Sequence, residues 1–110
     1  DGCPDFIAAH RLLGEIALGE SDLPLARGHF GYAFTIGKKA LKKAGVSGPV
    51  PYGREPNQAF YEAGKGLAFC LRQLGKRETA CEVVDDLLRL DPADPLGVRG
   101  LLETPPPPTT

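Results

Sequence analysis

Residues 67–92 read LAFCLRQLGKRETACEVVDDLLRLDP, and this stretch decides the fold that the sequence predicts. Apolar residues recur every three or four positions on both sides of Gly75, which is the spacing of helices that each bury one face. Gly75 and Lys76 fit a tight turn between two helices of about four turns each. Asp91 ends the second helix, because a residue before proline avoids helical geometry. A single helical hairpin cannot bury the apolar faces of both helices, so the stretch predicts one unit of a helical repeat.

The bulk composition is that of one ordinary domain. The chain has 110 residues, 42% of them hydrophobic, with 13 basic and 14 acidic side chains and a net charge of −1. A balanced charge gives no reason to expect a nucleic-acid partner. The longest apolar run is far short of the roughly 20 residues that cross a bilayer, so no direct membrane insertion is expected. The chain contains no Met and no signal peptide, which favours a fragment lacking its natural N-terminus and a cytoplasmic location.

The first half of the chain predicts another helical hairpin. Residues 6–18 carry apolar side chains at helical spacing, and Gly19 is expected to close that helix with a positive φ. Ser21 and Asp22 are candidate caps for a second helix, with proline in its first turn. This helix is expected to reach about Ala44.

The second half begins after a loop that is rich in glycine and proline, residues 45–56. A third helix is predicted from about Pro56 to Leu74. Glycines inside it indicate that another helix backbone comes close. A short capping helix is expected over about 94–103, and residues 105–110 form a proline-rich tail.

Two copies of one pattern are present in the sequence, offset by 54 residues. The interval from Leu13 to Ala26 equals that from Leu67 to Ala80. Apolar residues then follow at the same steps in both copies, Phe30 and Ala33 in the first and Val84 and Leu87 in the second. The pattern resembles the tetratricopeptide repeat, a helix–turn–helix unit in which small residues let neighbouring helices approach. The matching positions, which the resemblance assigns to repeat packing, are Leu13, Gly14, Ala26, Phe30 and Ala33 in the first copy and Leu67, Ala68, Ala80 and Pro92 in the second.

The match to the family is incomplete, because its early Trp is replaced by His10 and Gly64, and its Tyr by Ala17 and Leu71. The resemblance implies an all-α, right-handed α-α superhelix of about five helices. A domain over 1–104 would hold repeat one at about 6–44, repeat two at about 57–92 and a capping helix of the kind common in bacterial members.

The resemblance also implies a protein-interaction module that binds a peptide or protein on the concave face of the first helix of each repeat. Carried onto this sequence, the partner-binding residues are Arg11, Glu15, Lys65, Phe69, Arg72 and Arg99. The basic members would bind carboxylates, and Phe69 would supply an apolar anchor. Two alternatives stay open: a structural subunit of a larger complex that docks through the apolar edge of the stack, and a solvated surface that binds nothing.

No catalytic, metal or cofactor site is predicted. His10 and His29 lie on apolar faces, where a histidine is usually hydrogen-bonded in the core, and the histidines and cysteines lack the spacing of zinc ligands. Cys70 and Cys81 are expected to be buried thiols, with a bridge between them as the alternative in an oxidising compartment. The lysines at 38, 39, 42 and 43 form either a solvated helix end or a docking patch for an acidic partner.

Overall fold

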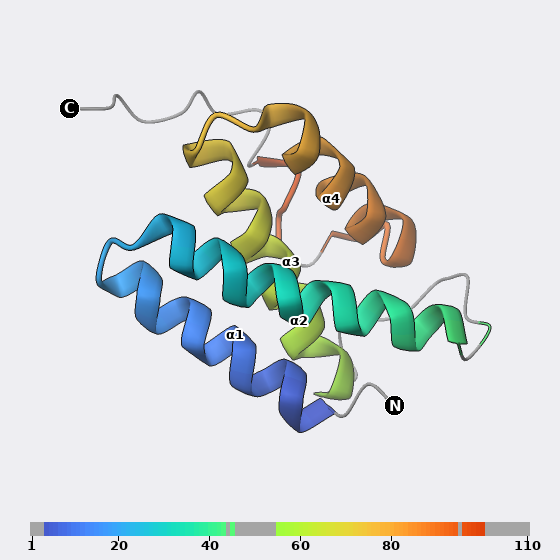
Figure 1. Cartoon of the computed structure of the whole chain (residues 1–110). Coiled ribbons are helices and arrows are strands. Elements are labelled where there is room, and N and C mark those ends of the chain that lie inside the picture. The colour runs from blue at the N-terminus through green and yellow to red at the C-terminus, as the bar shows by residue number, and fades with distance from the viewer. Residues whose placement is uncertain (1–3, 44, 46–54, 95, 101–110) are drawn as a thin grey trace.

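The fold is all-α. The computed structural model describes residues 4–43, 45, 55–94 and 96–100, and the described part holds helices and turns but no strand (Figure 1). The helices are α1 (Pro4–Gly19), α2 (Leu23–Lys43), α3 (Glu55–Gln73) and α4 (Arg77–Leu90). All four predicted spans agree with these bounds to within two residues, because the apolar period and the turn residues are local signals.

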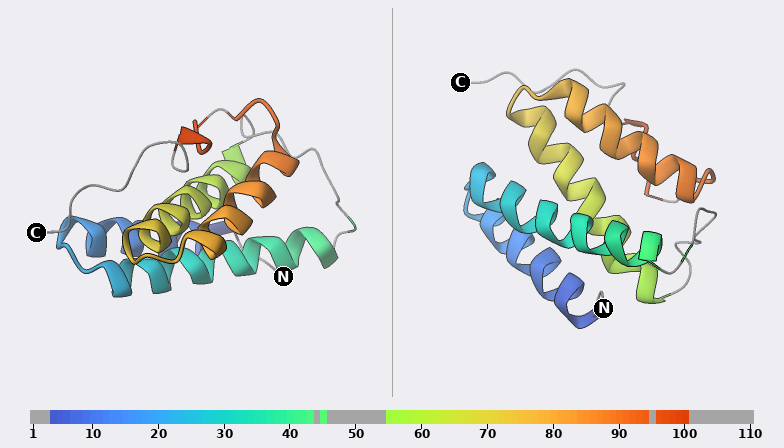
Figure 2. Two further views of the ribbon diagram at one scale, coloured as in Figure 1. Left: turned by 90° about the horizontal axis from the view of Figure 1, so that it is seen from above. Right: turned by 45° about the vertical axis from the view of Figure 1, so that its right-hand side comes forward.

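The four helices form two packed hairpins. α2 runs back along α1, and α4 runs back along α3 (Figures 1 and 2). α3 is the central element, since it packs against α1, α2 and α4. The face of α2 turned away from solvent is therefore covered by α1 on one side and by α3 on the other.

The turn between α3 and α4 is the one that the sequence predicts. Gly75 has a φ of +81°, its N–H donates to the carbonyl of Arg72 at 3.0 Å, and Lys76 N–H donates to that of Leu71 at 2.8 Å. This pair of bonds is a Schellman motif, which requires a residue with left-handed backbone geometry at the end of the helix. Glycine adopts that geometry without strain.

The turn between α1 and α2 repeats the same bonds 54 residues earlier. Asp22 N–H donates to the carbonyl of Ala17 at 2.9 Å, and Ser21 N–H donates to that of Leu18 at 3.0 Å. The residue with positive φ is Ser21, at +62°, whereas Gly19 is still helical. The prediction that Gly19 closes the helix with a positive φ is therefore wrong, because α1 ends two residues before the motif's left-handed position. Asp22 caps α2 as predicted, since its Oδ1 accepts from Leu25 N–H at 3.1 Å.

The core is built around aromatic rings that lie against glycines. Phe30 of α2 is 2% exposed, and its ring is in contact with Gly14 of α1 and Gly66 of α3. A methyl group added at either glycine would lie 2.7 Å from that ring. The glycines of α3 were expected to admit a helix backbone, but an aromatic ring fills the space at Gly66, and Leu87 lies beside Gly64.

The described residues do not show the predicted capping helix. The described residues 91–94 and 96–99 contain turns, and the Asp94 carboxylate accepts from Val98 N–H at 2.7 Å and from Arg99 N–H at 3.1 Å. Helical geometry begins only at Gly100, and the remaining residues of that prediction lie outside the described part of the chain. Val98 is buried in the core, so this part of the chain after α4 does contact the core, as a capping segment would. The tail and nearly all of the predicted loop also lie outside the described residues.

Candidate functional site

A groove of about 500 Å³ separates α1 from α3 and brings together part of the predicted binding face. Glu15 lines it from α1, and Lys65 and Phe69 line it from α3, one helical turn apart. The buried ring of Phe30 also lines it, as does Leu96 from the segment after α4. Three of the six residues predicted to bind a partner therefore share one cleft.

Arg11 lies beside this groove and binds its acidic side chains. Its Nη1 is 2.8 Å from Glu15 Oε2, and its Nε is 3.6 Å from Glu62 Oε1 on α3. Each pair is part-exposed and contributes up to about 1 kcal/mol. We predicted that Arg11 faces a carboxylate of the ligand, but in this structure its guanidinium is occupied by two carboxylates of the chain. The groove thus offers acidic groups and one lysine rather than a purely basic lining.

Besides Arg11, two further predicted residues do not line the groove. Arg72 lies a turn further along α3, and Arg99 lies in the turns after α4, where its backbone N–H binds Asp94. Leu96, which falls within the predicted capping helix, lines the groove. The sequence offered no means of finding its place, since that depends on the path of the chain after Pro92.

Most residues that the resemblance assigns to repeat packing are buried. The buried members are Gly14, Ala26, Phe30, Ala33, Leu67, Ala68 and Ala80. Leu13 and Pro92 differ: Leu13 is 43% exposed, and Pro92 is also exposed. Leu67, which holds the position equivalent to Leu13, packs beside Gly31 of α2. The exposure of Leu13 follows from the absence of a comparable helix beside α1 within the described residues.

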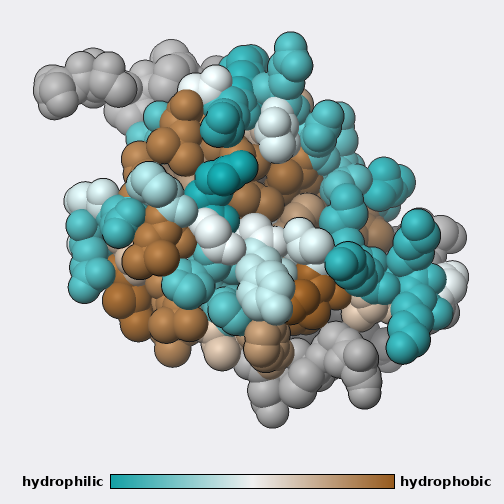
Figure 3. All heavy atoms as spheres, viewed as in Figure 1, coloured by the Kyte–Doolittle hydropathy of each residue, from teal (hydrophilic) through white to brown (hydrophobic). Residues whose placement is uncertain are grey.

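An apolar edge runs along α1 and the start of α2, and Figure 3 shows brown surface gathered where Figure 1 places these elements. In the described part of the chain, the large apolar side chains that are exposed lie here: Phe6, Leu12, Leu13, Ile16, Leu25 and Tyr32. We call this set the α1–α2 edge. Clustered exposed apolar side chains are typical of surfaces that contact another molecule.

The two histidines contact each other at this edge. His10 Nδ1 and His29 Nδ1 are 3.1 Å apart, so one ring donates a hydrogen bond and the other accepts it. Tyr32 stands edge-on to His10, with ring centroids 4.7 Å apart. The predicted hydrogen-bonded role is confirmed, although both rings are only half-buried.

Burial raises the pKa of one cysteine and one tyrosine of α3. Cys70 is buried in the core as predicted, whereas Cys81 is only half-buried, and both are free thiols with no bridge between them. Burial raises the pKa of the Cys70 thiol to about 11, which keeps it protonated and poorly nucleophilic at neutral pH. Burial, aided by the negative charge of Asp91, raises the pKa of the Tyr61 hydroxyl to about 12.

Comparisons with protein-family models, curated proteins and solved structures find no match to this chain. Among the described residues, no set of three or more His, Cys, Asp or Glu side chains is placed to hold a metal ion. The helices in that same part of the chain are also too short or too polar to span a bilayer.

Proposed function

We propose that this chain is a non-catalytic protein-interaction module that binds a peptide in the groove between α1 and α3. The observation that carries the proposal is the convergence of Glu15, Lys65 and Phe69 on one cleft of about 500 Å³. Such a cleft supplies an apolar anchor point and charged groups that fix the orientation of a ligand. The groove combines Phe69 with both signs of charge, so its ligand would pair an apolar side chain with at least one basic group.

We further propose that the two hairpins are tetratricopeptide-like repeats. The same Schellman bonds at Ser21 and Gly75, 54 residues apart, support this, because they place the first and second helices of both hairpins in the same register. The interior pairs agree with it too. Gly14 lies against Phe30 in the first hairpin, and the equivalent positions of the second hairpin hold the buried residues Ala68 and Val84, so that alanine replaces glycine where valine replaces phenylalanine. In this view α1 and α3 are the helices that face the ligand.

A peptide selection tests the binding proposal. Peptides selected from a random library displayed on phage should bind the isolated chain, and Phe69→Ala should weaken them about tenfold, the loss expected for one anchor of about 1.4 kcal/mol. Lys65→Glu should weaken peptides that carry a carboxylate at the matching place. Arg99→Ala is the matched control, since Arg99 was predicted to bind but does not line the groove. A library that yields no binders, or binders equally affected by Arg99→Ala, would contradict the proposal.

A second function is favoured by the α1–α2 edge: a structural subunit that docks on a helix of another chain. The edge repeats a surface that is already used inside the molecule. Four α1 residues correspond, at the repeat offset of 54, to four buried α3 residues on the face toward α2. The α1 residues are Phe6, Ala9, Leu13 and Ile16, and their α3 equivalents are Phe60, Ala63, Leu67 and Cys70. Phe60 stacks on Phe34 of α2 with centroids 5.1 Å apart. The α1 stripe therefore has the form of a surface that receives a helix.

The oligomeric state of the isolated chain distinguishes this second function from the first. If the edge joins copies of the chain, sedimentation equilibrium should give a mass that rises with concentration, and Leu13→Glu should abolish the rise because it places a charge in an apolar contact. Thr79→Glu, which adds the same charge to an exposed position of α4, should leave the rise unchanged. A mass that stays monomeric in wild type would leave the peptide-binding function as the better account.

A further inference from the structure

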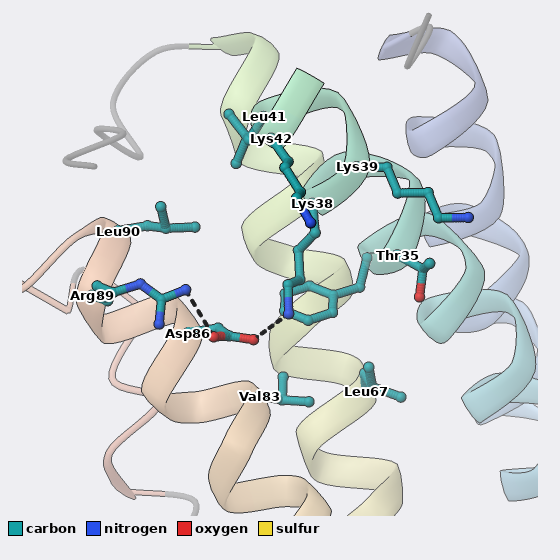
Figure 4. A pocket seen from close by; sticks show the side chains of 11 residues that line it. Thr35, Lys38, Lys39, Leu41, Lys42, Leu67, Val83, Asp86, Arg89 and Leu90 are labelled. Atoms are coloured by element: carbon teal, nitrogen blue, oxygen red, sulfur yellow. Dashed lines mark hydrogen bonds and ion pairs between the residues drawn. The ribbon is translucent and has the colours of Figure 1, made fainter. Parts of the chain in front are cut away.

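A larger groove, of about 600 Å³, opens between α2 and α4, and it shares no lining residue with the cleft between α1 and α3. Its base is apolar, formed by Phe34 and Leu41 of α2, Leu67 of α3, and Val83 and Leu90 of α4 (Figure 4). Phe34 and Val83 are buried. The base alone would suit the apolar side chains of a ligand, but the rim is charged.

Basic side chains from both helices surround that base. Lys38, Lys39 and Lys42 line the groove from α2, and Arg89 lines it from α4. In Figure 4 Lys38 and Arg89 both point toward Asp86, whereas Lys39 points away from it. The helix dipole explains a lysine in the last turn of α2. The dipole of α2 does not explain Lys38, more than a turn earlier, whereas Arg89 lies in the last turn of α4, where a cation suits the dipole of that helix.

Asp86 is the one carboxylate among the residues that line this groove, and it is shared by two cations. Its Oδ2 accepts from Lys38 Nζ at 2.6 Å, and its Oδ1 accepts from Arg89 Nη2 at 2.9 Å. The Asp86 side chain is only 18% exposed, so it lies at the bottom of the charged rim. Four basic groups and one carboxylate give the lining a formal charge of +3, in a chain whose net charge is −1. The local excess of positive charge is therefore a property of this groove and not of the whole surface.

We propose that the α2–α4 groove binds an acidic amphipathic segment of a partner protein. The apolar side chains of the segment would lie on the base of the groove, and its carboxylates would meet the free donors of Lys38, Lys42 and Arg89, as in helix-in-groove recognition. This second surface goes beyond the proposed peptide site between α1 and α3.

The lining favours a peptide over a nucleic acid. Single-stranded nucleic acids bind to exposed aromatic rings on which their bases stack. The ring that lines this groove, Phe34, is buried, and Lys38 Nζ lies 5.5 Å from its centroid. An apolar base beneath a basic rim matches carboxylates and aliphatic side chains that alternate on one segment.

Defined probes test this inference. Three labelled peptides of equal length are compared by fluorescence anisotropy: one with leucines at helical spacing and glutamates elsewhere, one with the glutamates replaced by lysines, and one of glutamates alone. An oligodeoxynucleotide of similar charge is the fourth probe. The leucine–glutamate peptide should bind most tightly, and raising the salt from about 0.05 M to about 0.3 M should weaken it without abolishing binding, because the apolar contacts are not screened.

Two neighbouring lysines provide the matched variants. Lys42 lines the groove, whereas Lys43, in the same last turn, is exposed and does not line it. Lys42→Glu should weaken the leucine–glutamate peptide about tenfold, and Lys43→Glu less than about threefold, because only the first places a like charge against the ligand. Both variants change the net charge and the helix end equally. Lys65→Glu, in the other groove, should change this affinity by less than about twofold, which separates failure here from failure of the α1–α3 site.

Several results would overturn the inference. If Lys42→Glu and Lys43→Glu weakened binding of the leucine–glutamate peptide equally, the binding would reflect long-range electrostatic attraction and not contact with the groove. Binding of the all-glutamate peptide or of the oligodeoxynucleotide as tightly as the leucine–glutamate peptide would remove the role of the apolar base. Absence of binding by the leucine–glutamate peptide at low salt would refute the site altogether.

Discussion

Replacing Phe30 with alanine is expected to lower the free energy of unfolding by about 3–5 kcal/mol, the range for removing a buried aromatic ring. The ring is 2% exposed and lies between Gly14 and Gly66. Neither glycine has a side chain that can move into the space left by the ring, so the cavity would persist. Urea denaturation followed by circular dichroism measures the change, with the slope of the transition checked for constancy.

Tyr32→Ala is the control for this prediction, because Tyr32 is an aromatic residue of the same helix that is half-exposed. It should cost about 1 kcal/mol, mainly from its ring contacts with Phe6 and His10. If Phe30→Ala cost no more than Tyr32→Ala, the ring could not be the centre of the core.

Replacing Gly66 with alanine is expected to lower the free energy of unfolding by about 1–3 kcal/mol, because overpacking outweighs the better helix propensity of alanine. The added methyl group would lie 2.7 Å from the Phe30 ring, and Gly14 on the far side leaves the ring no room to retreat. In a Phe30→Leu background the same change should cost less, and a double-mutant cycle measures the coupling.

Gly28→Ala is expected to have the opposite effect on stability, because an added methyl group meets no neighbouring atom there. Gly28 lies within α2, is exposed, and has open space where the methyl group would be placed. The change should therefore raise the free energy of unfolding by about 1 kcal/mol, the propensity difference between the two residues. A stabilising Gly66→Ala would show that α1, α2 and α3 do not approach one another as described.

The helices could be predicted from the sequence because their signals are local. The spacing of apolar residues and the cap at Asp22 place α2 to within two residues, and Gly75 marks the turn before α4. The end of α1 was placed wrongly, because Ser21 and not Gly19 takes the left-handed backbone geometry. A glycine indicates where such geometry is cheap, but it does not require it.

Contacts between helices that are distant in sequence were harder to predict from the sequence. The glycines of α3 indicated a close approach, yet they could not reveal that the ring of Phe30 fills the space. The apolar spacing of α1 likewise gives no sign that Leu13 is exposed while its equivalent, Leu67, is buried. Periodicity identifies an apolar face, but burial depends on which element lies opposite.

In the candidate sites, too, some features could be predicted from the sequence, whereas others depend on how distant helices are placed. Glu15, Lys65 and Phe69 share a cleft, because they lie on two helices that pack against each other. The pairing of Arg11 with Glu62 depends on the distance between α1 and α3, which no local pattern gives. The sequence indicated the α2–α4 groove only through its lysines, since its base requires the relative placement of two helices whose facing residues Lys38 and Asp86 are 48 positions apart.

The central claim, that a peptide binds between α1 and α3, is tested most directly by mapping a selected peptide onto the chain with two-dimensional ¹⁵N–¹H spectra. The account predicts that the largest shifts on titration fall at the amides of Glu15, Lys65 and Phe69, and that Phe69→Ala removes them. Shifts confined to α4, or to the α2–α4 groove, with those of α1 and α3 unchanged, would contradict it.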